Sequence, residues 1–221
     1  MLKPCLTALP FNLTVIDSIE PQALVASPPG PLAITLLGHG LDTNDNAIFT
    51  TPGRAESLFG IIQPGGSREN LMVTLPPELR PGVNVVQLVQ PAPVLSPPAC
   101  DPHVRSQSNA VAFMLVPALT QVDPSGPDQL QAVVWPPVGP LQQVSLLLNQ
   151  TMGSPPSRPL AFALPADAHP TETDTFTFST KFLGGSVPSG SYLARIRVDS
   201  AESRLTVNLA GTFDGPTVII S

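Results

Sequence analysis

Short hydrophobic runs, broken by proline- and glycine-rich turns, extend through the whole chain. Val15–Glu20 mixes apolar and polar positions and ends at Pro21, and a second apolar run, Leu32–Leu37, stops at Gly38-His39-Gly40. Short apolar stretches bounded by such residues predict β-strands. The same reasoning predicts strands at 47–50, 57–63, 69–75, 83–89, 108–116, 130–135, 144–149, 160–164, 175–179, 191–198, 204–209 and 217–220. No proline-free window has apolar residues at helical spacing, so we expect no long helix.

The alternation of side chains between residues 192 and 198 predicts a sheet with one wet face. Tyr192, Ala194 and Ile196 alternate with Leu193 and Arg195, and the pattern continues to the end of the run. Because successive strand residues point to opposite faces, the first set is expected in a core and the second near solvent.

An internal repeat predicts two domains. Leu119–Pro124 has the same order of apolar, polar, acidic and proline residues as Ile16–Pro21, at about a hundred residues' distance. Pro188-Ser189-Gly190 precedes an apolar strand as Pro81-Gly82 does, and Leu205–Val207 then corresponds to Val111–Phe113 in the first repeat. We therefore predict an all-β protein of two tandem immunoglobulin-like β-sandwiches, 1–116 and 117–221, with a proline-rich insertion at 91–107.

Composition narrows the class of protein. The chain of 221 residues has 29 prolines, 42% hydrophobic and only 12% charged residues, which is too apolar for a disordered chain and suits short strands with prolines at edges and turns. The net charge is −6 and the ten cationic residues are scattered, so we expect no nucleic-acid partner.

The sequence shows no targeting segment. No apolar stretch follows the start before Pro10, and the longest apolar run, Ala110–Leu119, contains Pro117 and is too short to span a membrane. We expect a cytoplasmic or particle-associated protein without membrane insertion. Cys5 and Cys100 permit one disulfide, but a chain of this size does not need it, and the pairing stays open.

Motifs for chemistry are weak. Asp42-x-Asn44-x-Asn46 begins like a calcium loop, yet Ala47 and Gly53 occupy the positions that need glycine and glutamate, so an Asx turn is the simpler interpretation. His39, His103 and His169 lie in separate loops, and Cys100-Asp101-Pro102-His103 lacks the converging ligands of a zinc site. There is no Gly-x-Ser-x-Gly elbow and no phosphate-binding loop. We predict neither an enzyme nor a cofactor.

Two resemblances sharpen this interpretation. Ile16–Pro21, Gly30-Pro31, Ile34–Leu41 and Leu79–Val89 resemble an early-set IPT/TIG domain. The segments 136–149, 187–207 and 215–220 resemble the C-terminal region of cap, or tail-terminator, proteins of extracellular contractile injection systems, which are phage-tail-like particles. This resemblance implies a non-enzymatic cap, terminator-associated or anchoring subunit. Its partners would be sheath, tube or other cap proteins. In the assembled particle, copies of the chain would form a homo-oligomer, such as a hexameric ring.

Two loops are the predicted partner contacts, 41–46 and the proline-rich 91–107. The candidate residues are Leu41, Asp42, Asn44, Asp45, Val94, Pro97, Cys100, His103 and Arg105. The alternative function is a surface adhesion or carbohydrate-binding module, which a cluster of exposed aromatic rings or calcium dependence would favour. Trp135, the single tryptophan, is expected to pack against a core and not to serve as a sugar platform.

Overall fold

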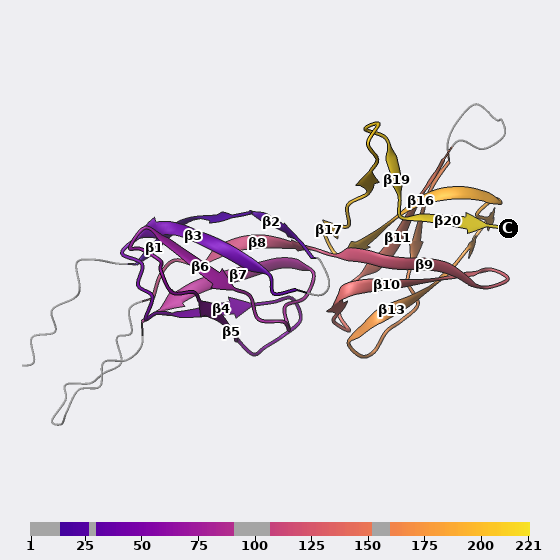
Figure 1. Ribbon diagram of the computed structural model, residues 1–221. Coiled ribbons are helices and arrows are strands. Elements are labelled where there is room, and N and C mark those ends of the chain that lie inside the picture. Colours follow the sequence, from indigo (N-terminus) through magenta and orange to yellow (C-terminus); the bar gives the residue numbers. More distant parts are fainter. Residues whose placement is uncertain (1–13, 27–29, 91–106, 152–159) are drawn as a thin grey trace, which may run out of the picture.

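The computed structural model describes residues 14–26, 30–90, 107–151 and 160–221, and every regular element in this part of the chain is a β-strand (Figure 1). The strands are β1 (Val15–Glu20), β2 (Ala23–Val25), β3 (Ala33–His39), β4 (Asn46–Thr50), β5 (Leu58–Ile62), β6 (Asn70–Thr74), β7 (Gly82–Val89), β8 (Val111–Val116), β9 (Ala118–Gly126), β10 (Gln129–Val138), β11 (Val144–Gln150), β12 (Ala161–Pro165), β13 (Thr173–Ser179), β14 (Lys181–Phe182), β15 (Gly185–Ser186), β16 (Gly190–Val198), β17 (Ala201–Glu202), β18 (Thr206–Val207), β19 (Phe213–Gly215) and β20 (Thr217–Ile220).

The first domain folds as two layers joined by one strand. β1, β3 and β6 form one layer and β4, β7, β8 and β2 the other, and β5 pairs with β4 through Leu58–Gly60 but with β6 through Ile61 and Ile62. The inward side chains of both layers form one buried cluster that includes Ile16, Leu36, Phe49, Val86 and Leu115. This is the layered core of a β-sandwich.

β2 is an element that the hydrophobic pattern did not predict. After β1 ends at Glu20, the chain crosses to the opposite layer, where Ala23, Leu24 and Val25 pair in parallel with Met114, Leu115 and Val116 of β8. A strand of three residues is too short to show any periodicity, which is why it was missed.

The second domain is a sandwich of a three-stranded sheet, β13-β10-β9, and a larger sheet, β12-β11-β16, in which β17 and β20 both pair with β16. Tyr192 is fully buried between the sheets, and its hydroxyl donates a hydrogen bond of 2.8 Å to the carbonyl of Pro188. A tyrosine near the start of this strand that bonds back to the preceding turn is a hallmark of immunoglobulin-like sandwiches. The chain is thus all-β with two tandem immunoglobulin-like domains.

Most predicted strands are confirmed to within two or three residues, including the alternation along β16, where Tyr192, Ala194, Ile196 and Val198 are buried and Arg197 is exposed. The predicted strand 204–209 is wrong as an element of the sandwich. Only Thr206 and Val207 are extended, and they pair with β19 in a separate hairpin. The reason is that β20 pairs with Gly190–Leu193 and β17 with Arg197 and Val198, so this edge of β16 is already used.

The two domains follow each other with a single residue between their strands. β8 ends at Val116 and β9 begins at Ala118, so that Pro117 alone connects them and the domains lie end to end (Figure 1). The buried clusters are separate: one is built from residues 16–115 and the other from residues 119–220.

Candidate interaction surfaces

The predicted contact loop at 41–46 lies at the end of the first domain that faces away from the second. Leu41 is 1% exposed and belongs to the core cluster, and Asp45 is 7% exposed, whereas Asp42 and Asn44 lie at the surface. The side chains of Leu41 and Asp45 therefore face the protein interior, and the residues of this loop that a partner can reach are Asp42-Thr43-Asn44 and Asn46.

This loop has the hydrogen bonds of the predicted Asx turn. The Asp42 carboxylate accepts hydrogen bonds of 2.9 Å from both the backbone and the side-chain amide of Asn44, and the Asp45 amide donates to the Asp42 carbonyl. These bonds fix the turn between β3 and β4.

Asp45 is a carboxyl group of this loop with a raised pKa. Burial and the neighbouring negative charge of Asp42 raise its pKa to about 6, against a backbone hydrogen bond that lowers it. Its Oδ2 atom is buried without a hydrogen-bond partner among the described residues. Burial disfavours the charged form, so Asp45 keeps its proton to a higher pH than an exposed aspartate does.

The second predicted contact loop lies mostly outside the described residues, and Val94, Pro97, Cys100, His103 and Arg105 all fall there, as does Cys5. The structure describes the residues that lead into this loop and Gln107, at which it ends. Val89 pairs with Asn46 of β4 and also bridges to Gln107. The two predicted loops therefore start from neighbouring strands at one end of the sandwich, where such folds commonly carry binding loops.

An ion pair between a buried arginine and a partly exposed glutamate joins the two domains at the opposite end of the first one. The Arg80 guanidinium donates two hydrogen bonds to Oε2 of Glu172, at 3.0 and 2.6 Å, and a third to the carbonyl of Pro52. The Arg80 side chain is 8% exposed, and that of Glu172 41%. Gly139 lies flat against the guanidinium, since a Cβ atom there would come within 2.5 Å of Nη1.

Gln142 forms the second polar link between the domains. Its side-chain nitrogen donates to the carbonyl of Pro81 at 2.7 Å and to the Asp199 carboxylate at 3.0 Å, and its oxygen accepts from the amide of Gly139. Every polar atom of this buried amide side chain is thus used. Together with the Arg80 pair, it fixes the orientation of the second domain on the first.

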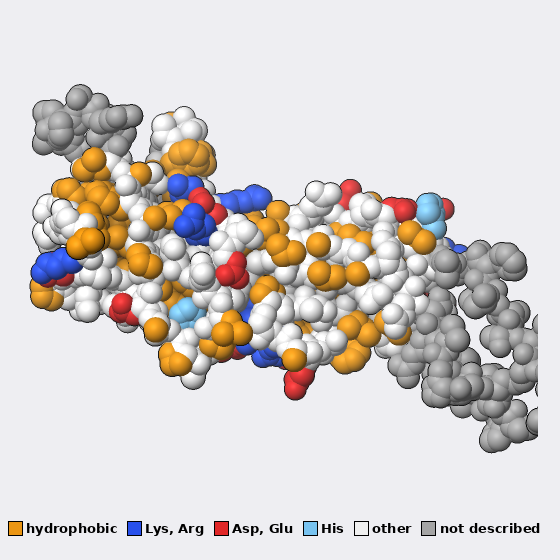
Figure 2. All heavy atoms as spheres, turned by 180° about the vertical axis from the view of Figure 1, so that it is seen from behind, with side chains coloured by type: hydrophobic (Ala, Val, Ile, Leu, Met, Phe, Trp, Pro, Cys, Tyr) orange, Lys and Arg blue, Asp and Glu red, His pale blue; other side chains and the backbone are white. Residues whose placement is uncertain are grey.

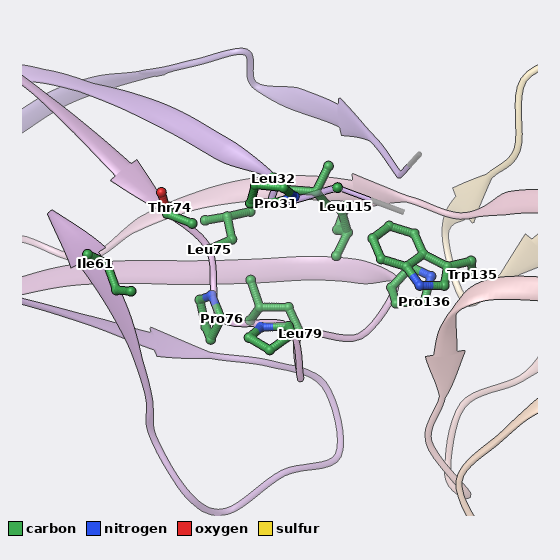
Figure 3. Close-up of a pocket in the computed structure, with 12 residues that line it drawn as sticks. Pro31, Leu32, Ile61, Thr74, Leu75, Pro76, Leu79, Leu115, Trp135 and Pro136 are labelled. Atoms are coloured by element: carbon green, nitrogen blue, oxygen red, sulfur yellow. The ribbon is translucent and has the colours of Figure 1, made fainter. Parts of the chain in front are cut away.

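An apolar pocket opens beside this junction, with a volume of ≈ 530 Å³ (Figure 3). Leu79 and Leu115 come from the first domain and Trp135 and Pro136 from the second, and Thr74 adds the one hydroxyl group of the lining. Trp135 packs against the core cluster of the first domain. The expectation that it is packed is confirmed, although the core that it covers belongs to the neighbouring domain. A lining with so few hydrogen-bonding groups suits an apolar group better than a sugar.

Several of the large exposed apolar side chains of the second domain lie on hairpins and edges. The β18–β19 hairpin projects from the sandwich (Figure 1), and its side chains Val207, Leu209 and Phe213 are 54%, 110% and 62% exposed. Hydrophobic side chains also gather at the end of the molecule remote from the first domain (Figure 2). Leu160, Phe182 and Leu183 are exposed as well. Contiguous exposed apolar groups of this kind mark interaction sites.

Sequence reasoning missed both the junction and the hairpins. Nothing in the sequence around Glu172 indicates that Arg80, 92 residues earlier, lies opposite it in the folded chain. The hairpin was mistaken for a closing strand because Leu205–Val207 matches the first repeat in sequence. Only the uncharged run 205–213 could have indicated an exposed apolar element.

Comparisons with known proteins leave the function unassigned. A family model described as a domain of unknown function (DUF8756) matches residues 114–219, which is just under half of the chain and corresponds to the second domain. No curated protein matches the chain. In the described residues, no helix has the length and apolar character needed to cross a membrane.

Several solved structures are similar to the chain. Domains FN1–FN3 of chicken CNTN1 match with 11% identity and a TM-score of 0.27, over 93% of this chain and 65% of that one. Murine CEACAM1b matches with 11% identity and a TM-score of 0.24, over 84% and 93%. A marsupial T cell receptor matches with 13% identity and a TM-score of 0.26, over 89% and 70%. The chain thus spans slightly less than two thirds of the first of these.

Proposed function

We propose that the protein is a non-enzymatic scaffold that acts by binding other proteins. The observation that carries this proposal is the β18–β19 hairpin, which holds Val207, Leu209 and Phe213 in solvent. Keeping apolar surface in water costs about 25 cal/mol per Å², so a projecting apolar hairpin has a physical reason to dock into a partner.

The hairpin is held in shape before any partner arrives. The side chain of Asn208 donates to the Thr212 hydroxyl at 2.6 Å and accepts hydrogen bonds from the amides of Ala210 and Thr212. At its base, the Thr206 hydroxyl donates to the Asp214 carboxylate at 2.7 Å. Because the backbone is already ordered, docking loses less conformational entropy than it would with a free loop.

The finer proposal is a cap or anchoring subunit of a contractile injection particle, with a first domain of the IPT/TIG type. Its support is the sequence resemblance of segments 136–149, 187–207 and 215–220 to cap proteins. An end-to-end pair of sandwiches fixed at Arg80–Glu172 suits such a role, because a rigid spacer holds its binding surfaces at a set separation. The partner of the hairpin would be an apolar pocket on a sheath, tube or cap protein.

The test is co-assembly of the tagged protein with purified sheath and tube particles, comparing wild type with Leu209→Ser/Phe213→Ser. We expect the wild type to sediment with the particles and the double variant to lose at least ten-fold in binding. Ile219→Ser is the matched control, since Ile219 is 70% exposed but lies on β20, outside the hairpin. Recovery of the wild type only as free protein would contradict the particle assignment. Undiminished binding of the double variant would contradict the hairpin's role.

A further inference from the structure

β12 is an edge strand with one unpaired side. In the described residues Ala161–Pro165 pair with β11 alone, in the register Leu148↔Phe162, and the bridge from Ala166 to Phe178 of β13 begins only after the strand has ended. Gln150 donates to the carbonyl of Leu160, and Ala166 donates to that of Val144, so the even-numbered residues bond to β11. In an antiparallel ladder the intervening residues direct their N–H and C=O groups the other way. Ala161 and Ala163 thus present backbone donors and acceptors outward.

The sequence of this strand is the same in both directions. Leu160-Ala161-Phe162-Ala163-Leu164 is a palindrome centred on Phe162, and it extends in sequence to a proline on each side, Pro159 and Pro165. Two antiparallel copies related by a two-fold axis at Phe162 therefore place Ala161 opposite Ala163 of the other copy. The two-fold axis generates this Ala161–Ala163 pair twice, and each of the two pairs exchanges two backbone hydrogen bonds. Phe162 lies opposite Phe162 of the other copy.

The surroundings of the strand fit such a pair. Residues 160–166 contain no charged side chain, so a symmetric ladder brings no like charges together. Beside the strand, a groove lined by Phe162, Lys181 and Phe182 opens between the two sheets, and Leu183 next to it is fully exposed. Natural edge strands are usually protected by inward charges or coverage, and long uncharged edges pair with other strands.

We propose that β12 is a homodimerisation strand, which pairs antiparallel with β12 of a second copy about a two-fold axis at Phe162 and joins the two larger sheets into one. The free backbone groups at 161 and 163 select an extended strand, and the palindrome makes the second copy the strand that fits. This surface is distinct from the β18–β19 hairpin, so the inference does not depend on the proposed function.

Analytical ultracentrifugation of the full chain over a range of concentrations measures the association. We expect a monomer–dimer equilibrium for the wild type, and at least a ten-fold weaker association for Ala163→Lys, which puts a charge on the exposed edge. Ala163→Pro removes the outward N–H without touching the bonds to β11, and should weaken the dimer equally. Thr217→Lys, an exposed change at the opposite edge of the same sheet, is the control and should dimerise like the wild type.

Disulfide trapping tests the register. In a background without Cys5 and Cys100, Ala161→Cys and Ala163→Cys proteins are mixed and oxidised. Directly opposed residues lie about 5.5 Å apart at Cα, within disulfide range, so the mixed 161–163 dimer should form well above the 1:2:1 ratio that random pairing of equal amounts gives. A wild type that stays monomeric, an unchanged dimer in the folded Ala163→Lys variant, or disulfide yields at or below the random 1:2:1 ratio for the mixed dimer would overturn the proposal.

Discussion

Asn84 and Tyr192 occupy the same position in the two domains. Asn84 lies on β7 and donates from its side chain to the carbonyl of Arg80, and Tyr192 lies on β16 and donates to that of Pro188. In each case the acceptor is four residues earlier and the turn contains a glycine with positive φ, Gly82 at 117° and Gly190 at 158°. The same corner is thus closed in the two repeats by different side chains.

Tyr192→Phe tests the energetic weight of this corner. The ring stays in the core, but the hydrogen bond to Pro188 is lost and its carbonyl is left without this donor. We expect the free energy of unfolding to fall by about 1 kcal/mol. Tyr192→Ala, which also empties the ring's space, should lose about 3–5 kcal/mol. Urea unfolding followed by circular dichroism measures both, and a phenylalanine variant as stable as the wild type would contradict the role of the hydroxyl.

The repeat itself was visible in the sequence, and the reason is physical. Turn residues before β7 and β16 and the alternation within each strand are local, so Pro81-Gly82 and Pro188-Ser189-Gly190 predict both corners. The pairing partners are not local. Whether Leu205–Val207 closes a sheet depends on β20, because the same edge of β16 can bond to only one strand at a time.

Gly60→Ala tests the crossing of β5 between the layers of the first domain. A Cβ atom at residue 60 would lie 2.5 Å from the Phe49 ring and 2.9 Å from the Thr74 carbonyl oxygen. Both neighbours are held by the sheets, so we expect a loss of about 1–3 kcal/mol in the free energy of unfolding. Gly30→Ala is the control, since nothing lies within 4 Å of its Cβ position, and should change stability by less than ~0.5 kcal/mol. Thermal unfolding compares the two.

Asp45 makes the stability of the first domain depend on pH. Its pKa is about 6 in the folded protein against 3.8 in a model compound, so the folded state binds more protons between these values. The free energy of unfolding therefore falls as the pH rises from 4 to 6. Asp45→Asn should be more stable than the wild type by on the order of 1–2 kcal/mol at pH 7 and equally stable near pH 4. If the free energies of unfolding of the two proteins differ by the same amount at every pH between 4 and 7, the prediction is contradicted.

Whether a candidate surface could be predicted depends on how far apart in the sequence its contacting residues lie. The Asx turn at Asp42-x-Asn44 was predicted correctly because its hydrogen bonds span two residues. The junction was not, since Arg80 meets Glu172 and Gln142 meets Pro81 only after both domains have folded and docked. The hydrophobicity of β12 was visible, but its position at a sheet edge follows only from the strand order.

Trp135 provides an optical probe of the junction between the domains. It is the single tryptophan of the chain and packs against the core of the first domain, so separation of the domains exposes its ring to water.

Glu172→Ala leaves the buried Arg80 guanidinium without its carboxylate partner. We expect a loss of about 1–2 kcal/mol in stability, less than for a fully buried pair because Glu172 is partly exposed, and an emission maximum shifted to longer wavelength. Asp174→Ala, two residues further on at the start of β13 and bonded to its neighbour Thr175, is the control and should leave the emission unchanged. If the Glu172→Ala variant has the same free energy of unfolding and the same emission maximum as the wild type, the ion pair does not hold the domains together. Gln142 and the apolar contacts of Trp135 must then do so alone.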